Sequence, residues 1–227
     1  MGHLGSVVVW VLLAGVSLLQ DDRDMRNILS LQAGVVGPDA FAGPVQNGFH
    51  AIIGMGANPW CCYQIQNEPV AELTGERIWR EPLGNFGGME ADVLPNVTAG
   101  VGNLRDYALT GAVFRIGQGL ASDFGVARVR PGMTGGDAYN PVKQFDWYLF
   151  GGVDGQLVAH DITLDGNTFV NSPSVPRNWF VGDLEVGAAI MFKNWRVSYT
   201  QVFETQTFRG EQGGLHQFGS LALAGRF

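Results

Sequence analysis

The feature that most constrains the fold is a two-residue alternation of apolar and polar side chains, interrupted by glycine-rich turns. It is clearest in Trp195–Glu204, where apolar residues alternate with Arg196, Ser198 and Thr200. Glycine supplies 33 of the 227 residues, roughly twice its usual share, which argues against a helical bundle. The chain is therefore expected to be all-β, built from antiparallel strands.

The same alternation predicts about nine strands along the chain. The amino-terminal segment Leu4–Leu19 is apolar and uncharged, but it lacks a preceding cation and a cleavage motif, so a signal peptide fits poorly. We expect it to form a hairpin with Ile28–Val36 across the acidic turn Asp21–Asp24. The later strands are expected at Val70–Trp79, Met89–Ala99, Leu104–Ile116, Phe145–Ile162, Leu184–Phe192, Trp195–Glu204 and His216–Phe227.

Two classes of β protein share this alternation. In a soluble sandwich the apolar face points inward, whereas in an outer-membrane barrel it points to lipid and the polar face lines the interior. Aromatic residues near strand ends, such as Trp79 and Trp195, and strands long enough to cross a bilayer favour the membrane barrel. In a membrane barrel, Arg226 is expected to point inward, because arginine on the lipid face is costly. A soluble ligand-binding barrel is the alternative to the membrane barrel. An odd number of strands should not close, so we expect the first strands of such a barrel to be missing before this chain.

Charge excludes one class of partner. The chain has 14 basic and 21 acidic residues, a formal net charge of −7 and no basic stripe. Nucleic acid is therefore not an expected partner.

Several ordered motifs resemble one family. The motifs are Gly34–Pro38, Val45–Gly54, Gln66–Pro69, Leu149–Val153, Leu164–Thr168, Val181–Leu184, Ser198–Thr200 and Phe218–Gly219. Together they resemble the lipid A 3-O-deacylase family of outer-membrane enzymes. The resemblance implies a twelve-stranded barrel with a short helix in an extracellular loop, of which residues 1–227 would be a single, amino-terminally truncated domain.

Counting strands backwards from the carboxy terminus gives an orientation that does not depend on the motifs. With the carboxy terminus in the periplasm, the turn Lys193–Asn194 lies inside and the connection Val36–Pro69 lies outside, where lipid A resides. The same reasoning puts the long connection Gly117–Gln144 on the periplasmic side, where such barrels usually have short turns.

The expected chemistry is ester hydrolysis. By resemblance His50 is the general base that activates water, and Gln46, four residues earlier, would share a helix face with it and donate to the oxyanion. From the residues alone, a surface helix with a merely hydrogen-bonded His50 is the alternative.

The family also implies calcium, which takes oxygen ligands. An acidic ligand is expected six residues after His50, but Gly56 stands there and has no side-chain oxygen. An Asn-Asp pair expected on the family's first strand is absent from this chain. Glu68 could substitute, although a solvated loop carboxylate is the simpler interpretation. Calcium binding and turnover are therefore both in question for this chain.

Other residues carry less weight. Cys61 and Cys62 are too few to form a zinc site, Asp165–Asn167 is expected to be a turn, and His160 and His216 show no partner pattern. The leading hypothesis is an outer-membrane deacylase acting on lipid A of lipopolysaccharide, with His50 and Gln46 in its site. The alternative is a non-catalytic outer-membrane barrel that has kept the fold and lost the site.

Overall fold

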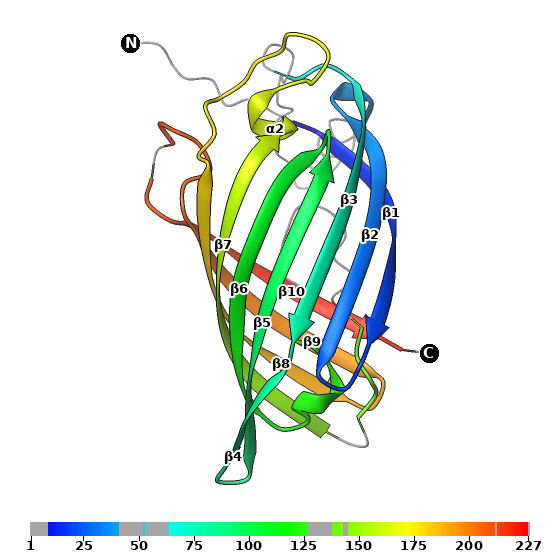
Figure 1. The fold of residues 1–227 in the computed structure, drawn as a ribbon, viewed down its shortest axis with the longest axis vertical. Coiled ribbons are helices and arrows are strands. Elements are labelled where there is room, and N and C mark those ends of the chain that lie inside the picture. Colours follow the sequence, from blue (N-terminus) through cyan, green and yellow to red (C-terminus); the bar gives the residue numbers. More distant parts are fainter. Residues whose placement is uncertain are drawn as a thin grey trace.

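The computed structural model describes residues 9–40, 52, 64–126, 138–142, 145–211 and 213–226. Nearly all regular structure is antiparallel β, and the strands form one sheet that curls into a half-barrel (Figure 1). The strands are β1 Val11–Asp21, β2 Met25–Val36, β3 Glu68–Trp79, β4 Glu81–Phe86, β5 Met89–Gly102, β6 Arg105–Gly117, β7 Phe145–Asp161, β8 Phe180–Phe192, β9 Trp195–Glu204 and β10 His216–Gly225. Among the described residues, no helix is both long and apolar enough to cross a membrane.

The predicted hairpins are confirmed. Strands β1 and β2 pair along their whole length around the acidic turn, and β8 pairs with β9 around Lys193, which has a positive φ of 52°. Strand β4 was not predicted, because Pro82 and Gly84 within it are typical of a turn. It pairs only with β5, all six of its residues are exposed, and the hairpin extends beyond the rest of the sheet at the bottom of Figure 1.

The sheet has two ends. Its order is β1-β2-β3-β5-β6-β7-β8-β9-β10, with β4 beside β5. Because every neighbouring pair is antiparallel, the first and ninth strands of this order run in the same direction. Direct closure between β1 and β10 would have to be parallel, which agrees with the expectation that this number of strands does not close an antiparallel barrel.

The apolar face points outward. On β9, Trp195 and Val197 are 45% and 42% exposed, whereas Arg196 and Ser198 between them are 1% and 4% exposed. The same alternation holds on β8, where Leu184 is exposed and Glu185 is buried. A polar interior inside an apolar wall is the arrangement of an outer-membrane barrel, and it contradicts the soluble sandwich.

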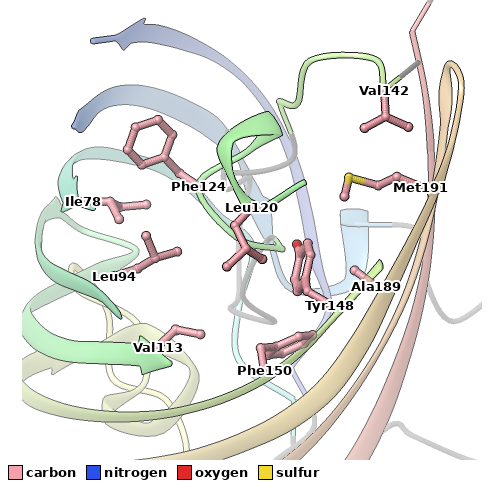
Figure 2. Close-up of a cluster of buried hydrophobic side chains, with 10 residues drawn as sticks. All are labelled: Ile78, Leu94, Val113, Leu120, Phe124, Val142, Tyr148, Phe150, Ala189 and Met191. Carbon is pink, nitrogen blue, oxygen red and sulfur yellow. The ribbon is translucent and has the colours of Figure 1, made fainter. Parts of the chain in front are cut away.

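The long connection after β6 enters the interior. Its described parts, residues 118–126 and 138–142, include a 3-10 helix, η2 Leu120–Ser122. Leu120, Phe124 and Val142 pack against strand side chains in one buried cluster (Figure 2). The strand residues of that cluster are Ile78, Leu94, Val113, Tyr148, Phe150, Ala189 and Met191. The connection after β6 can be long although it lies at the end with short turns, because its described parts pack inside the barrel.

Buried ion pairs hold this connection. Asp123 is 1% exposed, and its carboxylate accepts from Arg115 at 2.5 Å and from Arg196 at 2.8 Å. Arg115 also pairs with Asp92 at 2.5 Å, and the Tyr148 hydroxyl donates to Asp123 at 2.9 Å. Burial raises the pKa of Asp123, but the two guanidiniums and the donors outweigh burial, so its pKa lies below the usual range.

Arg226 follows the last strand. Its Nη1 donates to the backbone oxygen of Tyr139 at 3.1 Å and to Oδ1 of Asn140 at 3.0 Å. Tyr139 is itself buried and its hydroxyl donates to the backbone oxygen of Asn194. The side chain of Arg226 is therefore directed at the interior connection.

Candidate functional site

The residues predicted for catalysis belong to the connection between β2 and β3. Gln46, His50 and Gly56 lie outside the described residues, as do Cys61 and Cys62. Their roles therefore stay predictions. Ile52 is described: its backbone is helical and its side chain is 82% exposed.

The described ends of this connection are fixed beside each other. A 3-10 helix, η1 Pro38–Ala40, follows β2, and the backbone nitrogen of Asp39 donates to Oδ1 of Asn67 at 2.8 Å. Gly37 has a φ of 98°, and a Cβ added there would meet Asn67 Oδ1 at 2.7 Å, so the close approach requires glycine. The two ends leave the barrel at the end opposite the turn Lys193–Asn194.

A small apolar cluster supports the same end. Val36 and Ile65, which flank the connection, are 0% and 1% exposed. They pack with Val70, Leu104 and Ile162. Ile162 begins the short helix α2 Ile162–Asp165, which follows β7 and is capped by the Asp161 side chain accepting from the Thr163 backbone nitrogen at 3.0 Å. Burying these side chains holds both ends of the connection against the β7–β8 loop.

Glu68 is a buried acid at this end of the barrel, and both of its carboxylate oxygens accept hydrogen bonds. It is 3% exposed, so its interpretation as a solvated loop carboxylate is wrong. Oε1 accepts from Asn103 Nδ2 at 3.1 Å, and Oε2 accepts from Asn167 Nδ2 at 3.1 Å and from the Thr168 backbone nitrogen at 2.9 Å. Both carboxylate oxygens therefore have partners, which is what makes a buried carboxylate tolerable.

Asn167 joins two distant motifs into one structure. Its Oδ1 accepts from the Gln66 backbone nitrogen at 2.7 Å, and its Nδ2 donates to the Gln66 backbone oxygen at 2.8 Å. With the bond to Glu68, this amide links the segments Gln66–Pro69 and Leu164–Thr168. Asp165 is the last residue of α2 and Gly166, at a φ of 82°, is its C-cap, so the segment expected to be a turn is the end of a short helix.

Polar groups continue down the interior beneath Glu68. Glu72, 4% exposed, accepts from Gln32 Nε2 at 3.0 Å and from the Thr74 hydroxyl at 2.9 Å. At the start of β6, Arg105 donates to Gln156 Oε1 at 2.8 Å and pairs with Asp161 at 3.3 Å. The interior at this end of the barrel is therefore lined by hydrogen-bonding side chains.

Two histidines have partners that the sequence did not reveal. His160 Nδ1 lies 3.3 Å from Oδ2 of Asp165, which also pairs with Arg177. His216 Nε2 lies 2.6 Å from Oε1 of Glu211. In each pair the acid lies five residues from the histidine, across the end of β7 or the start of β10, and the fold brings the two side chains together there.

The described donors do not fit calcium. No group of three or more His, Cys, Asp or Glu side chains suited to a metal occurs in the described part of the chain. Glu68, the possible substitute ligand, has both oxygens engaged by nitrogen donors. Since calcium needs several oxygen ligands, we derive no chemical step through it.

Comparison with known proteins identifies the family. A family model described as outer membrane protein LpxR matches residues 10–227. The fold is similar to that of LpxR from Salmonella typhimurium, with a TM-score of 0.77 and 25% identity, covering 95% of this chain and 73% of that one. No curated protein matches the chain in sequence. The resemblance predicted from the ordered motifs is therefore confirmed, and the chain belongs to the LpxR family of outer membrane proteins.

Proposed function

We propose that this outer-membrane protein hydrolyses an ester-linked 3-O-acyl chain of lipid A. The observation that carries the proposal is the family match over residues 10–227, which spans Gln46 and His50. It is supported by the fixed ends of their connection, which leave the barrel opposite the short turns. In bacterial outer-membrane barrels the long loops are extracellular, and the outer leaflet contains the lipid A substrate.

In the proposed reaction, His50 accepts a proton from water as that water adds to the ester carbonyl. Gln46 donates a hydrogen bond to the oxygen on which negative charge develops. The bond between the acyl carbon and the sugar oxygen then breaks, the departing sugar oxygen takes the proton from His50 and becomes a hydroxyl, and the acyl chain leaves as a free fatty acid. Asn103, Asn167 and the interior polar groups belong to the end of the barrel that would face the sugar headgroup.

The test is hydrolysis of lipid A by purified protein in mixed detergent micelles, followed as the mass loss of lipid A and the release of 3-acyloxyacyl or 3-hydroxyacyl fatty acid. His50→Ala should lower the rate by at least a hundredfold, because general-base catalysis contributes about 10²–10⁴-fold. His216→Ala is the matched control, since it removes an imidazole from the start of β10. Hydrolysis that is unchanged in His50→Ala would overturn the mechanism.

The second candidate is a barrel that has lost catalysis. It is favoured by Gly56 at the position of an expected acidic ligand and by the engaged oxygens of Glu68. This candidate predicts no hydrolysis by the wild type. Gly56→Glu should then produce calcium-dependent hydrolysis if the ligand alone was lost, and Gly56→Gln, which has the same length without the charge, is its control. No gain in Gly56→Glu would favour the non-catalytic protein.

A further inference from the structure

A groove of about 820 Å³ crosses the outer wall of the sheet. Its floor is a row of paired residues on adjacent strands, in which Gly75 of β3 faces Ala99 of β5, and Ala99 faces Ala108 of β6. Leu29 and Leu18 continue the row across β2 and β1. Leu18, Leu29 and Val97 are exposed at 67%, 49% and 45%. Small residues between large apolar ones leave a channel on a face that otherwise carries bulky side chains.

The groove runs diagonally through the membrane. Leu18 lies three residues before the end of β1, beside the short turn to β2, whereas Ala108 lies three residues after the start of β6, at the opposite end. The row spans four strand spacings, about 19 Å. An extended acyl chain is the ligand that fits a narrow apolar channel of that length open to hydrocarbon.

The lower end of the groove is polar and carries Arg77 on the exposed face of β3, while the acid Glu76, which also lines the groove, is half-buried. Gln20, Asn27 and Arg77 pair in register on β1, β2 and β3, immediately beside the apolar row, and Trp79 borders them. Arg77 Nε donates to Asn27 Oδ1 at 2.7 Å, which holds the guanidinium on the outward face. The guanidinium has further N–H donors besides Nε, and guanidinium recognises phosphate well.

The depth of Arg77 selects the headgroup. It lies two residues from the end of β3, about 7 Å along the strand, at the end of the barrel with the short turns. An arginine on the lipid face is costly at the bilayer centre and tolerated near the interface, where tryptophan is also enriched. The cation therefore lies at the headgroup level of the periplasmic leaflet, away from the lipid A of the outer leaflet.

We propose that this groove binds one glycerophospholipid of the periplasmic leaflet, with its phosphate on Arg77 and Asn27 and an acyl chain along Gly75, Ala99 and Ala108. The site is separate from the connection between β2 and β3, whose described ends lie at the other end of the barrel. Charge complementarity and the apolar channel together define the ligand, since neither a free phosphate nor an uncharged diacylglycerol would use both parts.

The test is native mass spectrometry of the detergent-purified protein titrated with dioleoyl phosphatidylglycerol. Wild type should retain one molecule per chain. A Cβ added to Gly75 would have nothing within 4 Å, so Gly75→Leu fills the groove without an internal clash and should weaken retention at least tenfold. Ala71→Leu, outward on the same strand but away from the groove, is the matched control and should bind as wild type.

The charge is tested separately. Arg77→Gln should weaken retention of phosphatidylglycerol at least fivefold and leave the weaker retention of dioleoylglycerol unchanged. Arg23→Gln removes a charge from the same rim without a place in the groove and should have no effect. Heat-modifiable mobility on gels confirms that each variant is folded. Equal phosphatidylglycerol retention in all four variants would overturn the proposal, as would preferential retention of lipid A, of inorganic phosphate alone or of a second copy of the chain.

Discussion

Removing Asp123 should destabilise the barrel more than any comparable change at its surface. Asp123 is 1% exposed and accepts from Arg115, Arg196 and Tyr148. Asp123→Ala takes away the carboxylate that joins the interior connection to β6, β7 and β9. The prediction concerns the free energy of unfolding of the whole sheet, because those strands all contribute to the contact.

The size of the loss in unfolding free energy depends on which carboxylate partner each arginine still has after the substitution. Arg115 retains Asp92 at 2.5 Å, so much of its charge stays compensated. Arg196 is 1% exposed and loses the carboxylate at 2.8 Å. Breaking one buried ion pair costs about 3–5 kcal/mol, and we expect a loss in that range. Asp123→Asn keeps the shape and one acceptor oxygen, so a loss of about 2 kcal/mol is expected, as for hydrogen bonds to charged groups.

The assay is equilibrium unfolding of the protein in lipid vesicles by urea or guanidinium, followed by tryptophan fluorescence. Asp24→Ala is the matched control, because Asp24 is an exposed turn acid at the same end of the barrel and should change stability by about 0.5 kcal/mol or less. A loss below about 1 kcal/mol for Asp123→Ala would refute the argument that the buried carboxylate stabilises the connection.

Two further predictions follow from the same interior and wall. The pKa of Asp123 is lower in the folded protein than its unfolded value of about 3.9. The stabilisation by its carboxylate is therefore fully present above about pH 4 and is lost as pH falls through the folded pKa. The difference in unfolding free energy between wild type and Asp123→Asn should be constant from neutral pH to about pH 4 and should shrink below it. Val153 is 57% exposed at the middle of β7. In the same assay, Val153→Arg should lower the free energy of unfolding by about 2–4 kcal/mol, whereas Val153→Leu should change it little. Equal stability of the two Val153 variants would contradict a lipid-facing wall.

The wall could be predicted from the sequence because its signal is local. Alternation in Trp195–Glu204 needs only neighbouring residues, and the exposure of Trp195 and burial of Arg196 confirm both faces. Strand β4 escaped because Pro82 and Gly84 are typical of turns, while its pairing with β5 alone tolerates them.

The interior connection could not be predicted in the same way. Its ion pairs join residues far apart in the chain, such as Asp123 with Arg196. Alternation predicts that Arg196 faces inward, but only the fold shows that Arg196 and Arg115 both donate to the carboxylate of Asp123. Helices and strands follow from periodicity, whereas a loop that fills a barrel follows from contacts that have no period.

The candidate site, too, was predictable only in part from the sequence. Gln66–Pro69 and Leu164–Thr168 were each recognised as family-like motifs, but nothing in either motif predicts that Asn167 donates to Glu68 across about 100 residues. This contact can be tested by exchanging its donor and acceptor. Asn167→Asp places a second carboxylate against Glu68, and we expect a loss of about 1–3 kcal/mol from repulsion and a lost donor. Glu68→Gln should lose a similar amount, because it turns an amide toward the donors Asn103 and Thr168.

The double variant Glu68→Gln/Asn167→Asp restores a donor opposite an acceptor with the direction of the bond reversed. If the contact is direct, a double-mutant cycle in the unfolding assay should give a favourable coupling of about 0.5–3 kcal/mol. The partnership with Asn103 supplies the control, because Glu68→Gln/Asn103→Ala restores no such pair. Additive losses in the Asn167 cycle would mean that the two motifs stabilise this end of the barrel separately. The β2–β3 connection would then be held against the β7–β8 loop by the apolar cluster of Val36, Ile65 and Ile162 instead.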